Sequence, residues 1–122
     1  MSSLKESPKN ISFRKLMADS IRDLLADRRH GKFGIAGDIH EGTIISLDEV
    51  REPKFWPETE TEKKRVNQAA VFGKVDEICN VVLVRGWFGS FALTWEERSD
   101  FAEATVSFRK TEKVTRANSS TI

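Results

Sequence analysis

One stretch of the sequence, Ile11 to His30, constrains the fold of this 122-residue chain more than any other. Its apolar side chains recur at intervals of three and four residues, with charged side chains between them. This spacing predicts an amphipathic helix. The apolar stripe consists of Phe13, Leu16, Met17, Ile21, Leu24 and Leu25. Because exposed stripes of this size are uncommon on monomers, either the rest of the chain or a partner molecule must cover it.

The residues around this helix predict where it starts and stops. Asn10 or Ser12 can cap its first turn, and Gly31 can end it in the left-handed conformation that glycine tolerates. Residues 1–10 and 115–122 are polar, and we expect a flexible leader and a flexible tail there. The remaining residues, 11–114, have the length of a single ordinary domain.

The rest of this domain is dominated by β-strand signals. Glycines at four positions within residues 31–42 predict a strongly bent backbone, and residues 43–50 are rich in β-branched side chains. A charged loop with two prolines follows. Three further segments are predicted to be strands: residues 66–75, 81–84 and 105–114. Residues 87–104 fit both helix and strand, and the capping-box pattern at residues 94–97 favours a helix in the second half.

In order, these elements predict an α+β protein with an N-terminal amphipathic helix and a strongly bent antiparallel sheet. The order of elements matches an OB-like barrel over residues 33–114, with a short helix before the last strand. A glycine-bent first strand is what barrel closure needs, because that strand pairs along both of its edges. A sandwich and an α+β roll stay open as alternatives.

Several short segments carry a resemblance to a known group of proteins: GDIHEGTIISLDEV, FWP, VNQAAVF, VLVRG and ATVSF. Together they resemble small OB-like (oligonucleotide-binding fold) proteins encoded by bacterial phages and plasmids. The resemblance covers residues 37–108 and leaves out the leading helix. It implies single-stranded nucleic-acid binding or a replication-accessory role, in a phage or viral protein.

The charge balance limits how such a protein can find a polyanion. Lys and Arg total 20 against 19 Asp and Glu, so the formal net charge is only +1. No strong field steers the whole molecule, and polyanion binding must come from a local patch. The single cysteine, Cys79, excludes an intramolecular disulfide, and no apolar run has the length of a membrane helix. These features predict a cytoplasmic protein, in the host-cell cytoplasm if the source is viral.

Catalytic and metal-binding signals are weak in this sequence. The glycines lack the spacing of a phosphate-binding loop. Asp38 and Glu41 flank His40 and could hold a metal or act as a base, but we interpret this group as part of a solvated loop. We interpret Cys79 as a small buried side chain rather than a nucleophile. The sequence therefore predicts a non-enzymatic protein with no cofactor and no metal site.

Aromatic and basic residues alternate in a pattern typical of single-stranded nucleic-acid binding, in which aromatic rings stack on bases and cations contact phosphates. The predicted contact residues are Phe55, Trp56, Lys63, Lys64, Arg65, Arg85 and Arg109. An alternative for Trp56 is that it plugs the end of the barrel. A second aromatic group is predicted to belong to the core: Trp87, Phe88, Phe91 and Trp95.

A second function fits the leading helix. If its apolar stripe contacts another chain rather than its own sheet, the protein is a protein-protein adaptor or a self-assembling structural subunit, such as a homo-oligomer. The stripe from Phe13 to Leu25 is then the contact surface. Packing of this helix within its own chain is the interpretation that we favour.

Overall fold

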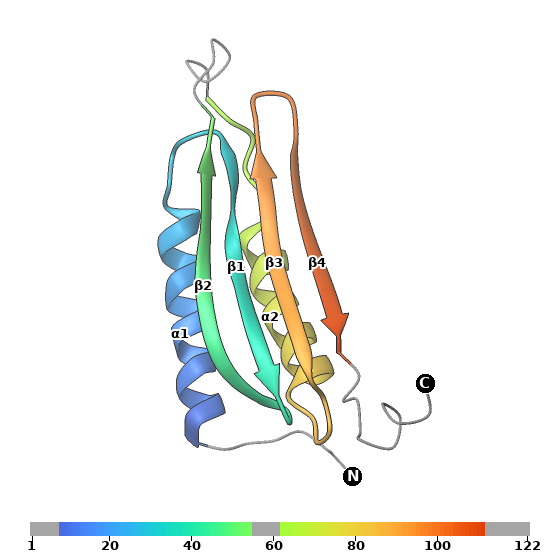
Figure 1. Cartoon of the computed structure of the whole chain (residues 1–122). Coiled ribbons are helices and arrows are strands. Elements are labelled where there is room, and N and C mark those ends of the chain that lie inside the picture. The colour runs from blue at the N-terminus through green and yellow to red at the C-terminus, as the bar shows by residue number, and fades with distance from the viewer. Residues whose placement is uncertain (1–7, 55–61, 112–122) are drawn as a thin grey trace, which may run out of the picture.

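The structure is a computed structural model that describes residues 8–54 and 62–111, and it is an α+β fold as predicted. Its elements in chain order are α1 (Pro8–Leu25), β1 (Gly31–His40), β2 (Thr43–Pro53), α2 (Gln68–Val82), β3 (Gly89–Glu97) and β4 (Ala102–Lys110). The strands form one antiparallel sheet in the order β2-β1-β3-β4, and both helices lie on the same face of it (Figure 1). The sheet is open, so the predicted barrel is wrong.

The sheet does not close into a barrel, because the segment predicted to be one long bent strand forms two separate strands, β1 and β2. Gly42, expected to bend one long strand, instead lies with Glu41 in a tight turn in which both residues have positive φ, 70° and 52°. Such a left-handed turn joins the antiparallel strands β1 and β2 into a hairpin. Among the described residues, β2 pairs only with β1 and β4 only with β3, which leaves both as edges.

The central strands show which face of the sheet is covered. In β1, Phe33, Ile35 and Ile39 are buried beneath the helices, while Lys32 and His40 lie on the opposite face and are exposed. This period of two is the pattern of a sheet covered on one side. The uncovered face therefore belongs to the surface of the described part of the molecule.

Helix α1 packs on its own sheet. It begins at Pro8, a residue suited to the first helical position, and ends at Leu25. It is shorter than predicted at its C-terminal end, and Gly31 begins β1 instead of ending the helix. Four stripe residues belong to the core: Met17, Ile21, Leu24 and Leu25. Phe13 is partly buried, and Leu16 is 48% exposed.

Helix α2 replaces the strands predicted at residues 66–75 and 81–84, which are wrong. Its N-cap is Asn67, whose side chain accepts a hydrogen bond from the backbone N–H of Ala70 at 3.0 Å. The buried residues of the helix recur at helical spacing: Val71, Val75, Ile78, Cys79 and Val82. A valine-rich segment has strand propensity, but a capped segment that buries one helical face against a sheet gains more from packing.

The remaining predictions divide between right and wrong. The helix expected after residue 94 is wrong, because residues 94–97 belong to β3. Trp87, Phe91 and Trp95 are buried in the core, as predicted, and so is Cys79, but Phe88, which was predicted with them, is only partly buried and lies outside the core. In the described ranges, neither helix is long and apolar enough to cross a lipid bilayer.

Asn10 joins the start of α1 to the β1–β2 turn, a role different from the capping role predicted for it. Its side chain is buried, donates to the carbonyl of Gly42 at 2.9 Å and accepts from the N–H of Ile44 at 3.1 Å. We expect Asn10→Ala to lower the free energy of unfolding by about 2 kcal/mol, because it leaves two buried backbone groups without these partners. Urea denaturation measures the change, with Ser12→Ala on the exposed side of the same helix as control. A loss no larger than that of the control would contradict this role.

Candidate functional site

A buried ion pair organises one end of the molecule. Glu97, at the end of β3, is fully buried, and its Oε1 lies 2.7 Å from Nζ of Lys63, whose side chain is only 2% exposed. Nζ also donates to the backbone carbonyls of Asp27 at 2.8 Å and Arg29 at 2.7 Å. The ammonium group therefore has two backbone hydrogen bonds in addition to its ion pair with the carboxylate. The pair ties the segment before α2 to both the end of β3 and the turn after α1.

The same carboxylate helps to place Arg65. Its second oxygen accepts from the backbone N–H of Val66 at 2.9 Å and lies 3.4 Å from Nε of Arg65. The far end of the Arg65 guanidinium donates to the carbonyl of Leu25, the last residue of α1. The last carbonyls of a helix lack intrahelical partners, so Arg65 acts as a side-chain cap for α1.

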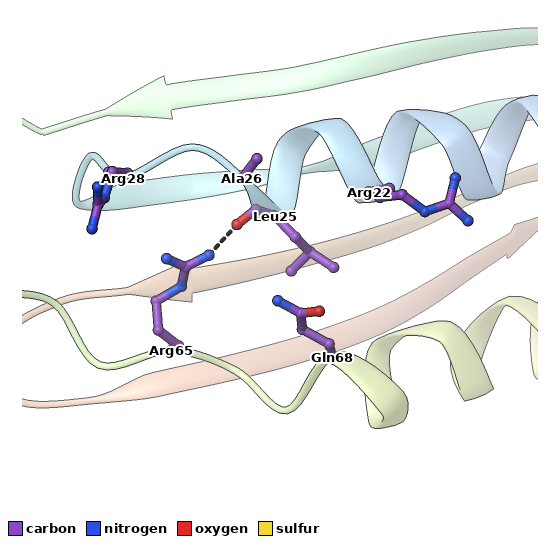
Figure 2. Close-up of a pocket in the computed structure, with 6 residues that line it drawn as sticks. All are labelled: Arg22, Leu25, Ala26, Arg28, Arg65 and Gln68. Carbon is purple, nitrogen blue, oxygen red and sulfur yellow. Dashed lines mark hydrogen bonds between the residues drawn. The ribbon is translucent and has the colours of Figure 1, made fainter.

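A cleft of about 420 Å³ lies where α1 ends and α2 begins (Figure 2). Figure 2 shows Arg65, from the segment before α2, and Gln68, from the first residue of α2, extending toward the end of α1. The cleft is lined by Arg22, Leu25, Ala26, Arg28, Arg65 and Gln68. Three of these side chains are guanidiniums, which stay protonated at any physiological pH.

The positive charge of this cleft is only partly compensated. Arg22 pairs with Asp19 at 3.0 Å, but both side chains are more than half exposed, so water and salt screen that pair strongly. Arg28 is exposed and has no ion-pair partner among the residues described. The charge of Glu97 is already matched by Lys63, so Arg65 adds an excess positive charge. The N-terminus of α2 adds a partial positive charge beside Gln68.

Asp27 holds the turn that presents Arg28. Its Oδ2 lies 2.7 Å from Arg29 and 3.2 Å from Arg51, and its side chain is 7% exposed. Chiefly because of the hydrogen bonds from the Arg29 side chain, the pKa of Asp27 is lowered from 3.8 to about 2. The carboxylate is therefore charged at neutral pH and links the α1–β1 turn to β2.

The predicted nucleic-acid contacts are brought together only in part. Lys63, Lys64 and Arg65 lie at the cleft end, where Lys64 is exposed, Arg65 lines the cleft and Lys63 is buried in the ion pair. Arg85 lies at the opposite end of the molecule, in the turn after α2 (Figure 1). Arg109 is on the uncovered face of the sheet near that opposite end. Phe55 and Trp56 fall outside the described residues.

Sequence reasoning missed the part of the cleft contributed by Arg22, Arg28 and Gln68. Arg28 belongs to the basic run Arg28-Arg29 after the first helix, which is a sequence signal. Nothing in the sequence indicates that this run lies close to the segment containing Arg65, which follows it by almost forty residues. The contact between Arg65 and Leu25 brings the two segments together.

The residues suspected of metal or nucleophile chemistry have other contacts. Asp38 accepts a hydrogen bond from the Ser46 hydroxyl at 2.7 Å, and Glu41 accepts one from the N–H of Gly86 at 2.6 Å. The His40 ring meets the edge of Phe88 with centroids 4.8 Å apart. Over residues 8–54 and 62–111, no group of three or more His, Cys, Asp or Glu side chains is arranged to hold a metal ion.

No protein-family model, curated protein or solved structure matches this chain. The resemblance to small OB-like proteins of phages and plasmids stays a prediction. The geometry of the cleft is therefore the basis for the functional argument that follows.

The structural role of the buried pair between Lys63 and Glu97 can be tested by substitution. We expect Lys63→Met to lower the free energy of unfolding by about 3–5 kcal/mol, because it leaves the Glu97 carboxylate without its main countercharge. The double variant Lys63→Met with Glu97→Leu should be more stable than Lys63→Met, since no charge then stays buried. Urea denaturation of the variants measures both differences. A Lys63→Met variant as stable as the wild type would contradict the structural role of the pair.

A second test uses the way in which the stability of the folded protein changes at acid pH. Because Asp27 has a lower pKa in the folded state than its ordinary value of 3.8, its contribution is complete above that value and is lost as the pH falls toward 2. We expect Asp27→Asn to destabilise the protein by about 1 kcal/mol near neutral pH, after screening of the exposed arginines. Urea denaturation measured at several pH values should show that the difference in unfolding free energy between the variant and the wild type becomes smaller at acid pH. The same difference in Asp76→Asn, on the exposed side of α2, would contradict the assignment.

Proposed function

We propose that this chain is a non-enzymatic binding protein that holds the phosphates of a single-stranded nucleic acid in the arginine-lined cleft. The observation that carries this proposal is that Arg22, Arg28 and Arg65 all line one cleft and that their charges are incompletely neutralised. Arginines from three separate segments gather at a junction of two helices, where a purely structural role requires only Arg65.

Guanidinium groups suit a phosphodiester because their N–H groups form a planar fork that matches two phosphate oxygens. Arg28 is free to turn toward such a group. Arg22 can exchange its exposed contact with Asp19 for one with phosphate at little cost, since exposed pairs of this kind contribute little to stability. Backbone N–H groups at the N-terminus of α2 add donors and a favourable dipole.

The size of the cleft supports a single strand. The cleft has a volume of about 420 Å³, which is far more than a single water molecule needs. That volume accommodates a phosphate with part of its sugar, and a single strand can bend its backbone into such a hollow. A duplex offers its phosphates only from the outside of a wide, stiff cylinder.

The uncovered face of the sheet is a poor site for phosphates, which favours the cleft as the binding site. By strand register it carries more carboxylates than cations: Asp38, Asp48, Glu52, Glu96 and Glu103 against Lys32 and Arg109. This face repels phosphates. The sheet surface that an OB-like protein would use is therefore a poor candidate, and Arg109 is a poor phosphate contact in this setting.

The sequence before the cleft adds a reason for single-strand binding. Phe55 and Trp56 precede Lys64 and Arg65 closely along the chain, and each base stacked on such a ring contributes about 1–3 kcal/mol. Their part in binding stays a prediction from the sequence.

The alternative function as an adaptor loses most of its proposed contact surface. The residues Met17, Ile21, Leu24 and Leu25 of the α1 stripe are buried against the chain's own sheet. A partner could reach them only by displacing α1. Of the predicted contact residues, exposed Leu16 and partly buried Phe13 are the ones that a partner could reach without moving α1.

Fluorescence anisotropy with a labelled single-stranded oligonucleotide tests the proposal. We expect binding that weakens steeply with salt, because bound cations displace condensed counterions. Arg28→Ala and Arg22→Ala should each weaken binding about tenfold, or about 1.4 kcal/mol, and each should lower the salt slope by about 0.7.

Arg85→Ala is the matched control, because Arg85 is an exposed arginine at the other end of the molecule and should leave the affinity unchanged. Absence of binding at low salt would overturn the proposal. So would a loss in Arg85→Ala equal to that in Arg28→Ala.

A further inference from the structure

The two edges of the sheet differ in a way that matters for association. The β2 edge carries Asp48, Glu52 and Pro53, and its register with β1 is interrupted beside Ile39. Charges, proline and bulges are the devices by which sheets avoid pairing with other chains. The β4 edge has no proline, keeps a regular register along its nine residues, and is uncharged from Ala104 to Phe108. Within residues 8–54 and 62–111, the β4 edge is thus the one open to another strand.

Apolar side chains lie beside this open edge on the helix-covered side. Val106 and Phe108 of β4 point to that side, and Phe108 is 37% exposed. On α2, Val81 is 38% exposed and lies half a turn around the helix from Phe72, whose ring contacts Arg22 of α1. Val81 therefore lies on the side of α2 away from α1, toward β4. The helices leave this strip of the sheet incompletely covered.

We propose that β4 pairs with β4 of a second copy of this chain, antiparallel and centred on Val106, which gives a symmetric dimer. In this register Glu103 lies opposite the partner's Arg109, and Ala104 lies opposite the partner's Phe108. The small side chain makes room for the ring. The four strands of each copy then form one continuous sheet of eight, with the helices of both copies on the same face.

Charge complementarity selects this partner and this register. Glu103 lies directly opposite Glu96 of β3, and like charges so placed are destabilising. Within the described ranges, neither Glu103 nor Arg109 has an ion-pair partner. A two-fold axis through Val106 gives each of them the opposite charge on the partner, so the pair forms twice. A shift of two residues in either direction places Glu103 opposite an uncharged side chain, Ser107 or Thr111, and a shift of one turns the apolar residues to the wrong face.

Charge reversal tests the dimer without disturbing the core, because both side chains are exposed. Sedimentation equilibrium of the wild type should show a monomer–dimer equilibrium as the concentration rises. Glu103→Arg and Arg109→Glu should each remain monomeric, because each sets like charges together twice. An equimolar mixture of these two variants should form a heterodimer, because both pairs are then attractive. Asp48→Lys, on the β2 edge, is the control and should dimerise as the wild type does.

A wild type that stays monomeric up to millimolar concentration would overturn the proposal. So would single variants that dimerise normally, because the interface would then be another surface. Capture of an unrelated protein by β4, in place of a second copy, would also overturn it. The dimer is tested by variants of Glu103 and Arg109 on β4, and the oligonucleotide cleft by variants of Arg22 and Arg28, so failure of one proposal leaves the other standing.

Discussion

The ion pair between Lys63 and Glu97 is the contact on which the end of this molecule depends. Burying two charges carries a large desolvation penalty, which close attraction between them and additional hydrogen bonds must offset. Here the ammonium group contacts two backbone carbonyls besides the carboxylate, and the carboxylate also accepts from Val66. Three segments that are distant in sequence are thereby held together. The cleft exists because Arg65 follows Lys63 by two residues and is carried to the end of α1.

The one-sided sheet decides where function can be located. Its helix-covered face is filled by apolar side chains, and its other face is polar with an excess of carboxylates, so neither face offers a basic binding platform. The usable surfaces are at the margins: the end where α1, the segment before α2 and β3 meet, and the outer edge of β4. Both margins carry charges without an ion-pair partner among the residues that the structure describes, Arg28 at the first and Glu103 with Arg109 at the second. The two proposals rest on these different margins and do not depend on one another.

Particular residues show why the sequence misled in places. The buried face of α2 consists largely of β-branched residues that recur at helical spacing: Val71, Val75, Ile78 and Val82. Their side chains favour a strand and their spacing favours a helix, so the local sequence alone does not decide between the two. The Asn67 cap resolves the ambiguity in favour of a helix. Residues 94–97 match the capping-box pattern, but buried Trp95 and Glu97 alternate with half-buried neighbours, and this alternation is that of a strand. Lys63 was predicted to contact phosphate because its countercharge, Glu97, is 34 residues further along the chain and cannot be recognised from the local sequence.

The sequence by itself determined the α+β composition, the first amphipathic helix and the β2 strand, because each follows from periodicity and propensity within one short window. It also placed the aromatic residues at 87, 91 and 95 in the core. Only the tertiary structure decided that the sheet stays open, that Lys63 is buried while Arg28 and Arg65 line a cleft, and that β4 is an unprotected edge. These properties depend on which distant segments become neighbours, and a buried charge or an unpaired edge is defined by those neighbours rather than by the residues themselves.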